Sequence, residues 1–421
     1  MKRRDMRWVL FFLLPLFLHG QLNYSGSLRP ATMVRTSDHS EISLPFRLLE
    51  AEVGYTHGNF DLKTNSALEY RWSSGENKFQ FREAYLTWFP SWGELKMGKQ
   101  IHAWGAVDGN NPTDNLNPYD YYYMFLAGTD RKIGTLSAAV KYYWNNLQIE
   151  AVYIPDHEGN RFPFGEEDFP ITMDDPGELV KKAKQDNEYG LRLQMVIGNS
   201  DVGLSYFTGS DRGFTHSGYN SSWEMVFPIF FYRKTDVLGF DIVSFIGDAT
   251  GRIEAGYYKT ENDYETDFSI LRDASYLQYT AQLEYTTSND MMITGQIIGS
   301  EILEVNGTSY IFDPLGILTE TYPMTKDEFQ PGMGTPFAMF TDLGLMLSVT
   351  GNYWDNALEI RGNTFWDLKD NQSMLGGGVS YSPIENWDLE LSITHFFGEE
   401  GTRFKEMEEF SHIRLGLGYH F

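Results

Sequence analysis

The sequence of 421 residues contains no cysteine, and after residue 20 it has no apolar run long enough for a membrane-spanning helix. Without cysteine the chain cannot form disulfides or thiolate metal sites, and it cannot carry the lipid of a lipoprotein. Basic residues are also scarce, since 33 Lys and Arg stand against 58 Asp and Glu, a net charge of −25. So acidic a chain repels phosphate backbones, and we expect no nucleic-acid partner.

The first 20 residues have the layout of an export signal. A basic segment, residues 2–7, precedes the apolar run 8–18, and polar sequence follows. The apolar run is shorter than the roughly 20 residues that a spanning helix needs, which favours a cleaved signal over an anchor. Without residues 1–20 the chain has 29 basic and 57 acidic residues, a net charge of −28. We therefore expect a signal peptide, 1–20, and one domain, 21–421.

Alternation of apolar and polar side chains is the dominant pattern in the rest of the chain. In residues 277–285, Leu, Tyr, Ala, Leu and Tyr alternate with Gln, Thr, Gln and Glu, and segments 60–72, 188–197 and 387–394 alternate in the same way. This period of two is typical of barrel strands with one face in lipid and the other in an aqueous lumen. The aromatic content of 16% suits the aromatic girdles of such a barrel.

The last strand carries the most specific short signal. Its apolar face ends on Tyr419 and Phe421, a resemblance to the C-terminal signature of bacterial outer-membrane proteins. In those proteins the terminal aromatic is read by the barrel-insertion machinery. The resemblance implies that Phe421 is a membrane-insertion signal, and that the partners include this machinery, outer-membrane lipid and lipopolysaccharide. An edge strand of a β-sandwich could alternate similarly, but a sandwich would need a second apolar layer.

Short turns alternate with long connections along the chain. Eight tight turns predict about 18 strands if both termini lie on the same side of the membrane. The fold expected is all-β: a transmembrane, antiparallel, up-and-down barrel with long extracellular loops. The longest connections span about 102–133, 155–186, 209–228 and 301–334. Residues 230–246 are interpreted as one long strand, and Asp175 to Glu178 resembles the start of a short helix.

The polar strand faces predict a lumen with charges of both signs. Opposed charges across an aqueous channel orient polar solutes, which is typical of porins. The alternative is that these charges pair across neighbouring strands and only stabilise the wall. The candidate pore-lining residues are Lys63, Arg71, Lys96, Arg192, Arg252, Glu254, Arg361 and Arg414.

The connection 102–133 is rich in acids, amides and tyrosines. Its Asn-Pro and Asp-Gly units favour a folded loop that constricts the lumen. Its oxygens could instead hold Ca²⁺, although the spacing is not that of an EF-hand, and no metal site is predicted. The constriction candidates are Trp104, Asp108, Asp114, Asp120, Tyr121, Tyr122 and Tyr123.

Several short motifs together resemble the porin-like outer-membrane β-barrels of the DUF1302 type. The resemblance covers the first half of the chain clearly and the second half only in strand layout. It implies a channel for small or partly apolar molecules rather than an enzyme, and it supplies no substrate residues. The motifs are Arg82-Glu-Ala-Tyr85, Gly98-Lys-Gln100, Trp104-Gly105, Asp108, Asn117-Pro118, Asp120, Pro155 and Arg161-Phe-Pro163.

Together these patterns predict an outer-membrane channel for passive or weakly selective uptake of small solutes, with no cofactor. The net charge suggests a preference for cations, although acids in the segments 399–400 and 406–409 could instead bind divalent ions that bridge lipopolysaccharide. A gated route for hydrophobic compounds, guided by the tyrosine run and by Phe162, Phe164 and Phe169, is the alternative. A hydrolase or a structural barrel is less favoured, because the histidines lie in no local catalytic motif. A homo-oligomer is possible.

Overall fold

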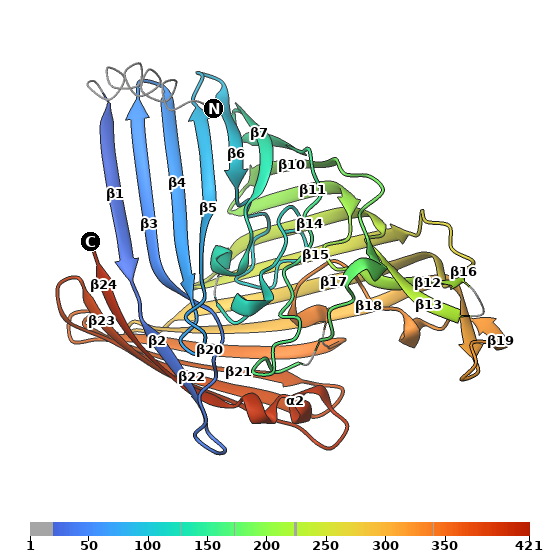
Figure 1. Cartoon of the computed structure of the whole chain (residues 1–421). Coiled ribbons are helices and arrows are strands. Elements are labelled where there is room, and N and C mark those ends of the chain that lie inside the picture. Colours follow the sequence, from blue (N-terminus) through green and yellow to red (C-terminus); the bar gives the residue numbers. More distant parts are fainter. Residues whose placement is uncertain (1–19, 127, 172, 223–224, 340) are drawn as a thin grey trace, which may run out of the picture.

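The computed structural model of the chain describes residues 20–126, 128–171, 173–222, 225–339 and 341–421. These residues form a closed barrel of 18 antiparallel strands with long loops at one end (Figure 1). The predicted fold class and strand number are confirmed. The predicted signal peptide, except for Gly20, lies outside the described residues.

Strand bounds follow the alternating segments of the sequence. The first nine barrel strands are β1 (Gln21–Leu28), β3 (Phe46–His57), β4 (Phe60–Tyr70), β5 (Asn77–Trp88), β6 (Gly93–Gln100), β7 (Thr135–Trp144), β8 (Leu147–Ile154), β10 (Glu188–Ile197) and β11 (Ser200–Ser210). The other nine are β14 (Lys234–Ile246), β15 (Ala249–Glu261), β17 (Leu271–Thr286), β18 (Met291–Phe312), β20 (Leu343–Tyr353), β21 (Leu358–Asp367), β22 (Gln372–Ile384), β23 (Trp387–Phe397) and β24 (His412–His420).

Closure of the barrel joins the two ends of the described chain. Each barrel strand pairs with the next in sequence, and β24 pairs with β1 and with β2 (Ala31–Arg35), which continues the line of β1. The backbone of Phe421 exchanges two hydrogen bonds of 3.0 Å with Gly26 of β1. A further strand, β19 (Leu318–Pro323), pairs with the outer end of β18. The sheet is therefore closed where β24 meets β1, and neither strand has an open edge there.

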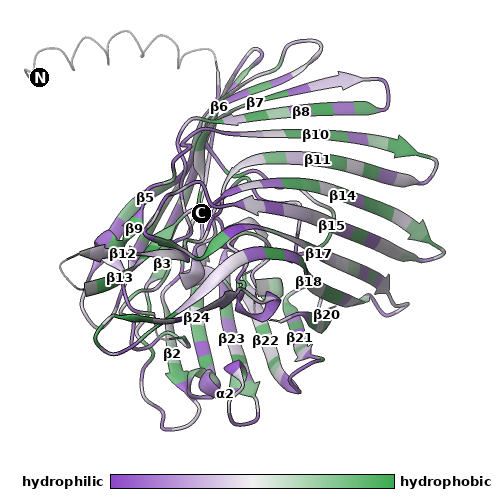
Figure 2. Cartoon of the chain, turned by 90° about the vertical axis from the view of Figure 1, so that its right-hand side faces the viewer, coloured by the Kyte–Doolittle hydropathy of each residue, from purple (hydrophilic) through white to green (hydrophobic). Residues whose placement is uncertain are grey.

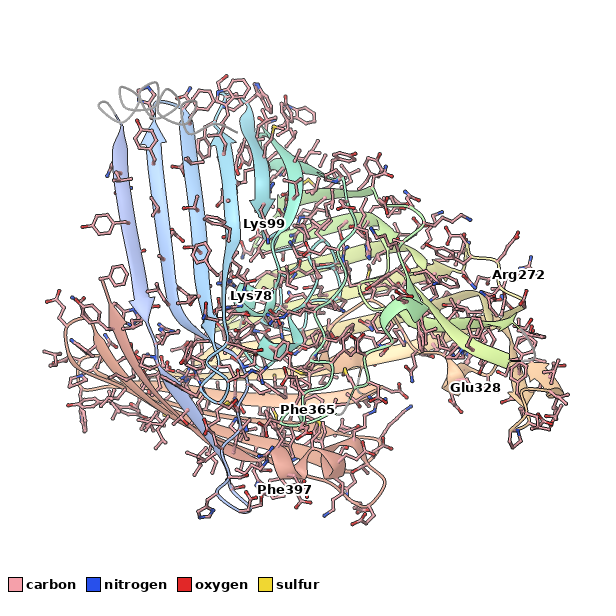
Figure 3. The ribbon with its side chains drawn as sticks, in the orientation of Figure 1. Lys78, Lys99, Arg272, Glu328, Phe365 and Phe397 are labelled. Atoms are coloured by element: carbon pink, nitrogen blue, oxygen red, sulfur yellow. The ribbon has the colours of Figure 1, made fainter. Side chains whose placement is uncertain are left out.

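The two faces of the wall differ as the alternation predicts. In β17 the Leu283 side chain is 52% exposed on the outside, whereas its neighbour Gln282 is 4% exposed on the inside. Figure 2 shows the same alternation as hydrophobic and hydrophilic bands along the strands. Exposed aromatic rings lie near both ends of the wall, with Trp88 and Trp144 beside tight turns and Phe397 (Figure 3) at the loop end. Such rings are suited to the two membrane interfaces.

All eight predicted tight turns connect neighbouring barrel strands. Asn145 (φ 53°) and Gly198 (φ 62°) take the left-handed backbone conformation that two-residue hairpins require. All eight turns lie at one end of the barrel, opposite the long loops (Figure 1).

One strand prediction is wrong. Residues 230–246 do not form a single strand, because β13 (Met225–Phe231) ends before β14 begins. Strand β13 belongs to a separate four-stranded sheet in the loops, with β9 (Val180–Lys181), β12 (Thr215–Ser222) and β16 (Phe268–Ser269). The break coincides with Arg233, whose buried guanidinium binds the Asp211 carboxylate at 3.2 Å. Since β12 and β13 form a hairpin inside one loop, the parity of the barrel strands is unchanged.

Helices in the described ranges are short, and none of them is both long and apolar enough to cross a membrane. The helix predicted after Asp175 is reduced to a 3₁₀ turn because the chain continues into β9, which pairs with β13. The helical segments are η2 (Tyr121–Tyr123), η3 (Gly128–Arg131), η4 (Gly177–Leu179), η5 (Lys326–Glu328), η6 (Phe337–Met339), α2 (Arg403–Glu406) and η7 (Glu408–Phe410).

Candidate channel lumen

The connection between β6 and β7, residues 101–134, folds into the barrel and is called the constriction loop here. Its Leu116 and Asn117 have no exposed surface. The Asn117 side chain accepts the His102 N–H at 2.6 Å, and it donates to the Gln100 carbonyl of β6 at 3.0 Å and to the Thr135 hydroxyl of β7 at 3.1 Å. The loop therefore enters the lumen, as one of the two sequence hypotheses expected.

Glu254 of β15 anchors the constriction loop to the wall. Its carboxylate, with no exposed surface, accepts five hydrogen bonds from the loop. Three come from the backbone N–H groups of Ala106 (2.7 Å), Val107 (3.2 Å) and Thr113 (2.9 Å). The Thr113 hydroxyl and the Asn111 amide donate the other two. Because loss of this acceptor would leave several buried donors unsatisfied, Glu254 fixes the path of the loop.

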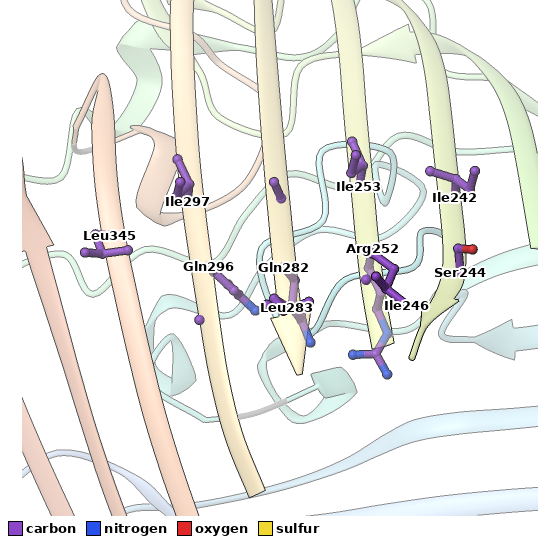
Figure 4. Close-up of a pocket in the computed structure, with 13 residues that line it drawn as sticks. Ile242, Ser244, Ile246, Arg252, Ile253, Gln282, Leu283, Gln296, Ile297 and Leu345 are labelled. Atoms are coloured by element: carbon purple, nitrogen blue, oxygen red, sulfur yellow. Dashed lines mark hydrogen bonds between the residues drawn. The ribbon is translucent and has the colours of Figure 1, made fainter. Parts of the chain in front are cut away.

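Asp108 makes the next contact with the wall. Its carboxylate accepts from the Gln282 amide at 2.6 Å and from Arg252 at 3.2 Å, and its carbonyl accepts from Gln296 at 2.6 Å. These three side chains come from the adjacent strands β15, β17 and β18 (Figure 4). The loop is thus fastened across three neighbouring strands.

The outer face of the same strands carries a shallow apolar groove. Ile253, Ile297 and Leu283 border it and are about half exposed (Figure 4). Gly251 and Gly295 also line the groove. These residues alternate with the lumen-facing Arg and Gln side chains of their strands. The groove therefore lies on the lipid side of the wall, outside the lumen.

Buried ion pairs fix the far side of the constriction loop. Arg212, which follows β11, binds both carboxylate oxygens of Glu188 at 2.6 and 3.0 Å. The same guanidinium donates to the loop carbonyls of Asn115 (3.1 Å) and Leu116 (2.9 Å). Arg212 thereby links the wall to the loop, and its charge is balanced by Glu188.

At the loop end of the barrel, arginines connect two loops to the first strands. Arg161 binds Glu69 of β4 at 2.8 Å and Asp120 of the constriction loop at 3.0 Å. The Tyr123 hydroxyl donates to Glu69 at 3.0 Å, and the Arg47 guanidinium lies 4.1 Å from the centre of the Tyr123 ring. Two of the predicted constriction residues, Asp120 and Tyr123, therefore hold the loop in place.

Arg71 and Glu166 form a second connection at this end. The guanidinium binds both carboxylate oxygens, at 2.8 and 2.5 Å, and the Tyr122 hydroxyl donates to Glu166 at 2.7 Å. Burial by itself would raise the pKa of Glu166, but the hydrogen bonds from Arg71 and Tyr122 outweigh it and hold the pKa below its usual value. The loop between β8 and β10 is thereby tied to the end of β4 by an ionised carboxylate.

Lumen-facing charges on the opposite wall are solvated. We call these side chains of β3, β4, β21, β23 and β24 the open arc. The side chains of Lys63, Glu52 and Arg361 are 30, 41 and 49% exposed, although they point inward. Arg414 and Glu390 are about one-third exposed and pair at 3.4 Å. Glycines lie next to these charged residues, such as Gly378 beside Arg361. Because glycine has no side chain, they leave room on this side of the lumen.

A group of buried rings, the phenylalanine cap, covers the loop end of the open arc. Phe365 (Figure 3) of β21 and Phe396 of β23 have no exposed surface and pack against Phe404 of α2, at ring-centre distances of 5.9 and 5.7 Å. The cap residues are Phe337, Phe365, Phe396, Phe404 and Phe410. The cap therefore joins the segment that carries α2 to strands β21 and β23 at the loop end of the open arc.

Comparisons with known proteins bear on the fold alone. No protein-family model and no curated protein matches the sequence. Among solved structures, Acinetobacter baumannii OccAB1 has a TM-score of 0.55 at 8% identity and covers 96% of each chain. Pseudomonas aeruginosa OccK2 in complex with glucuronate has a TM-score of 0.53 at 11% identity, over 95% of this chain and 98% of that one. OccK5 of the same organism has a TM-score of 0.51 at 11% identity, over 96% and 98%. The chain thus has the barrel fold of outer-membrane porins.

The structure separates the predicted pore-lining residues into three groups. Lys63, Arg361 and Arg414 lie in the open arc, and Lys96, which pairs with Glu94 at 2.9 Å, is 30% exposed. Arg192 is buried and binds Asp241 at 2.7 Å, so it stabilises the wall. Arg71, Arg252 and Glu254 hold loops, as described above. Whether any of these side chains contacts a solute stays a prediction.

The other predicted constriction residues are buried or paired with different neighbours. Trp104 is buried and donates to Glu150 of β8 at 3.2 Å, and Asp114 binds Lys132 at 2.5 Å. Tyr121 is buried and stacks on Phe162 at 4.8 Å. The loop acids have separate partners, and no cluster of metal-binding side chains occurs among the described residues. Phe421 is half exposed, and its role as an insertion signal stays a prediction.

Several residues that position the loops are absent from the sequence candidates. They are Arg47, Arg82, Lys132, Arg161, Glu166 and Arg212. Most lie within loops or at strand ends, where no periodicity distinguishes an inward side chain. Arg82 and Arg161 belonged to motifs of the family resemblance.

Proposed function

We propose that the chain is a porin-like channel of the outer membrane for small polar solutes. The observation that carries the proposal is the open arc, in which inward-facing charges remain accessible to water inside a closed barrel. Charges of both signs on a solvated wall can replace part of a solute's hydration shell while it passes. The structural neighbours OccK2 and OccAB1 share the barrel and support this assignment of fold.

The orientation follows the asymmetry of the loops. In outer-membrane barrels the short turns face the periplasm and the long loops face outward. We therefore place the eight tight turns on the periplasmic side and the phenylalanine cap on the extracellular side. Export by the signal peptide, association with lipopolysaccharide, membership of the DUF1302 type and homo-oligomerisation are further parts of this proposal.

Conductance of the purified barrel in planar bilayers tests the channel. We expect stepwise ion currents above the empty-bilayer baseline. A matched pair of variants, Gly378→Trp inside the open arc and Gly377→Trp on the same strand facing out, tests the route. The first variant should lower the unit conductance and the second should not. No current from refolded barrel, or equal currents from both variants, would contradict the proposal.

A second candidate function, uptake of compounds with apolar rings, is favoured by a path of aromatic side chains. Successive ring centres lie between 4.6 and 5.8 Å apart from the outer end of β18 to the constriction loop. All of these rings except Tyr121 are half-buried, which leaves ring edges or faces accessible. The path consists of Phe312, Tyr219, His216, Phe230, Phe214, Phe162 and Tyr121.

Replacement of two rings separates this function from simple permeation. In Phe162→Ala/Phe214→Ala we expect weaker block of the ion current by aromatic solutes, while block by a polar solute of equal size is unchanged. The control is Phe397→Ala, on the outer face of the wall. Equal block of the wild type and the double variant by every aromatic solute would reject the aromatic path and leave the channel proposal intact.

A further inference from the structure

The connection between β8 and β10, residues 155–187, reaches across the loop end of the lumen. Its middle contacts Arg35 of β2 and Arg71, which follows β4. In the closed sheet three strands, β5 to β7, separate β8 from β4, and five, β3 to β7, separate β8 from β2. We call residues 162–171 of this connection the lid. The lid therefore lies far from its own strands, at the loop end of the open arc.

Two carboxylates of the lid bind arginines of the first strands. Glu166 binds Arg71 through both of its oxygens, as described above. Asp168 accepts from the Arg35 guanidinium at 2.6 Å and from the backbone N–H of Ser43 at 2.9 Å. Hydrogen bonds between charged groups are stronger than those between neutral groups. Charged contacts therefore hold the lid to the wall at β2 and β4.

Aromatic rings pack the lid on the structures beneath it. The Phe169 ring is buried, and its centre lies 6.4 Å from that of Tyr122 in the constriction loop and 6.4 Å from that of Phe410 in the phenylalanine cap. Phe162, at the start of the lid, stacks on Tyr121. The lid thus covers both the constriction loop and the cap on the side of the open arc.

The residue before the lid is fixed. The Arg161 N–H donates to the Tyr119 carbonyl at 2.9 Å, and the Arg161 carbonyl accepts from the Tyr121 N–H at 3.0 Å. Among the described residues, by contrast, no backbone–backbone hydrogen bond joins the lid to the wall or to the constriction loop. Arg161 is therefore a firm point of attachment, and the lid beyond it is held by side chains.

The charged contacts of the lid are more exposed than those of the constriction loop. Glu254 and Arg212, which hold the constriction loop, have almost no exposed surface, whereas the four charged side chains that hold the lid are 15–27% exposed. Breaking a buried ion pair leaves charges without solvent, but partly exposed charges are solvated by water as they separate. Release of the lid therefore costs less than release of the constriction loop.

We propose that the lid is a gate over the open arc, closed in this structure, and that it opens when Glu166 and Asp168 separate from Arg71 and Arg35. The lid moves about Arg161, while Glu254 keeps the constriction loop in place. The inference rests on the proposed function, because a gate presupposes a channel. It assigns the control of passage to an element other than the constriction loop.

A reversible lock tests the gate, because the chain has no cysteine of its own. The variant Ser43→Cys/Asp168→Cys joins the lid to the segment before β3 at a point where the two residues are in contact. In planar bilayers the oxidised full barrel should lose most of its current, and a reducing agent should restore it. The control is Ser309→Cys/Tyr322→Cys, which joins paired residues of β18 and β19. It should conduct equally in both states.

Release of the lid is tested by Glu166→Gln/Asp168→Asn, which keeps the size of both side chains and removes their charges. We expect the ratio of open to closed time to rise by at least about tenfold, because hydrogen bonds to charged groups are lost. The control Asp342→Asn, which removes an exposed ion pair with Lys369, should leave the ratio unchanged.

Thiol labelling follows the lid without any ion current. In Phe169→Cys the new thiol is covered by the closed lid, so a maleimide should label it at least about ten times faster when Glu166→Gln/Asp168→Asn is added. An equal labelling rate would overturn the gate, as would equal currents from the oxidised and reduced lock variant once mass spectrometry shows the crosslink. In both cases the wild type would still conduct. Absence of current from every barrel, with faster labelling retained, would instead contradict the channel proposal.

Discussion

The carboxylate of Glu254 accepts two hydrogen bonds from Thr113, one from the backbone N–H at 2.9 Å and one from the hydroxyl at 2.7 Å. The two residues are 141 positions apart, and their contact joins the wall of the barrel to the loop inside it. Because Glu254 also accepts hydrogen bonds from three other N–H groups of the loop, it fixes which side of the lumen the loop occupies.

Replacement of this anchor should loosen the constriction loop. In Glu254→Ala several buried N–H groups lose their acceptor, and we expect the free energy of unfolding to fall by at least about 3 kcal/mol. The single-channel current should also fluctuate more, because the loop can leave the wall. Urea unfolding and bilayer recordings measure the two effects. Glu359→Ala, in the open arc, is the control, and equal behaviour of both variants would contradict the anchoring role.

Reversal of one charge in the open arc should alter ion preference. Arg361 is half exposed in the lumen, so Arg361→Glu is expected to raise the cation-to-anion permeability ratio. A rise of roughly fivefold corresponds to about 1 kcal/mol, the interaction of two unit charges 4 Å apart in water. Reversal potentials in a salt gradient give this ratio. Arg272→Glu, at the loop end of β17 (Figure 3), should change it less, and the same change in both variants would place the ion path elsewhere.

Two neighbouring phenylalanines of β23 test the phenylalanine cap. Phe396 has no exposed surface, whereas Phe397 is 46% exposed on the outer face. Truncation of a buried phenylalanine costs about 3–5 kcal/mol of packing, so Phe396→Ala should loosen α2 and increase the time that the channel spends open. Phe397→Ala should not. Single-channel recordings distinguish them, and an unchanged open time in Phe396→Ala would show that the cap does not limit passage.

Acid should destabilise the constriction loop through His102. Burial, together with the nearby positive charge of Lys132, lowers the pKa of His102 from 6.5 to about 3. The folded chain therefore keeps this imidazole neutral while the unfolded chain protonates it, so its contribution to stability is full above pH 6.5 and decreases as the pH falls towards about 3. Between pH 6.5 and 4.5 the unfolding midpoint should fall less in His102→Gln than in the wild type. The exposed His57→Gln should follow the wild type, and parallel curves for all three proteins would rule out this role.

Local patterns made most of the barrel predictable. Alternation placed β17 and β23, and turn residues such as Asn145 and Gly198 marked the hairpins, because strand and turn signals lie within about ten residues. The hairpin β12–β13 was not foreseen. Its second strand, 225–231, is apolar on both faces and continues directly towards β14, so periodicity could not separate a loop sheet from the wall.

The site was predictable only in part. The sequence identified Glu254, Asp108 and Asp120 as residues of interest, but it assigned Glu254 to pore lining and the two aspartates to the constriction. Their partners are loop N–H groups and side chains more than 40 residues away, and no short-range signal specifies such contacts.

One set of strands holds the constriction loop, and a different set faces the water of the lumen. Strands β15, β17 and β18 hold the loop, whereas β21, β23 and β24 present solvated charges. Substitutions on the second group can therefore change which solutes pass without weakening the attachment of the loop. This separation would allow related barrels to diverge in selectivity while they keep the same internal scaffold, and it marks β21 to β24 as the region to redesign first.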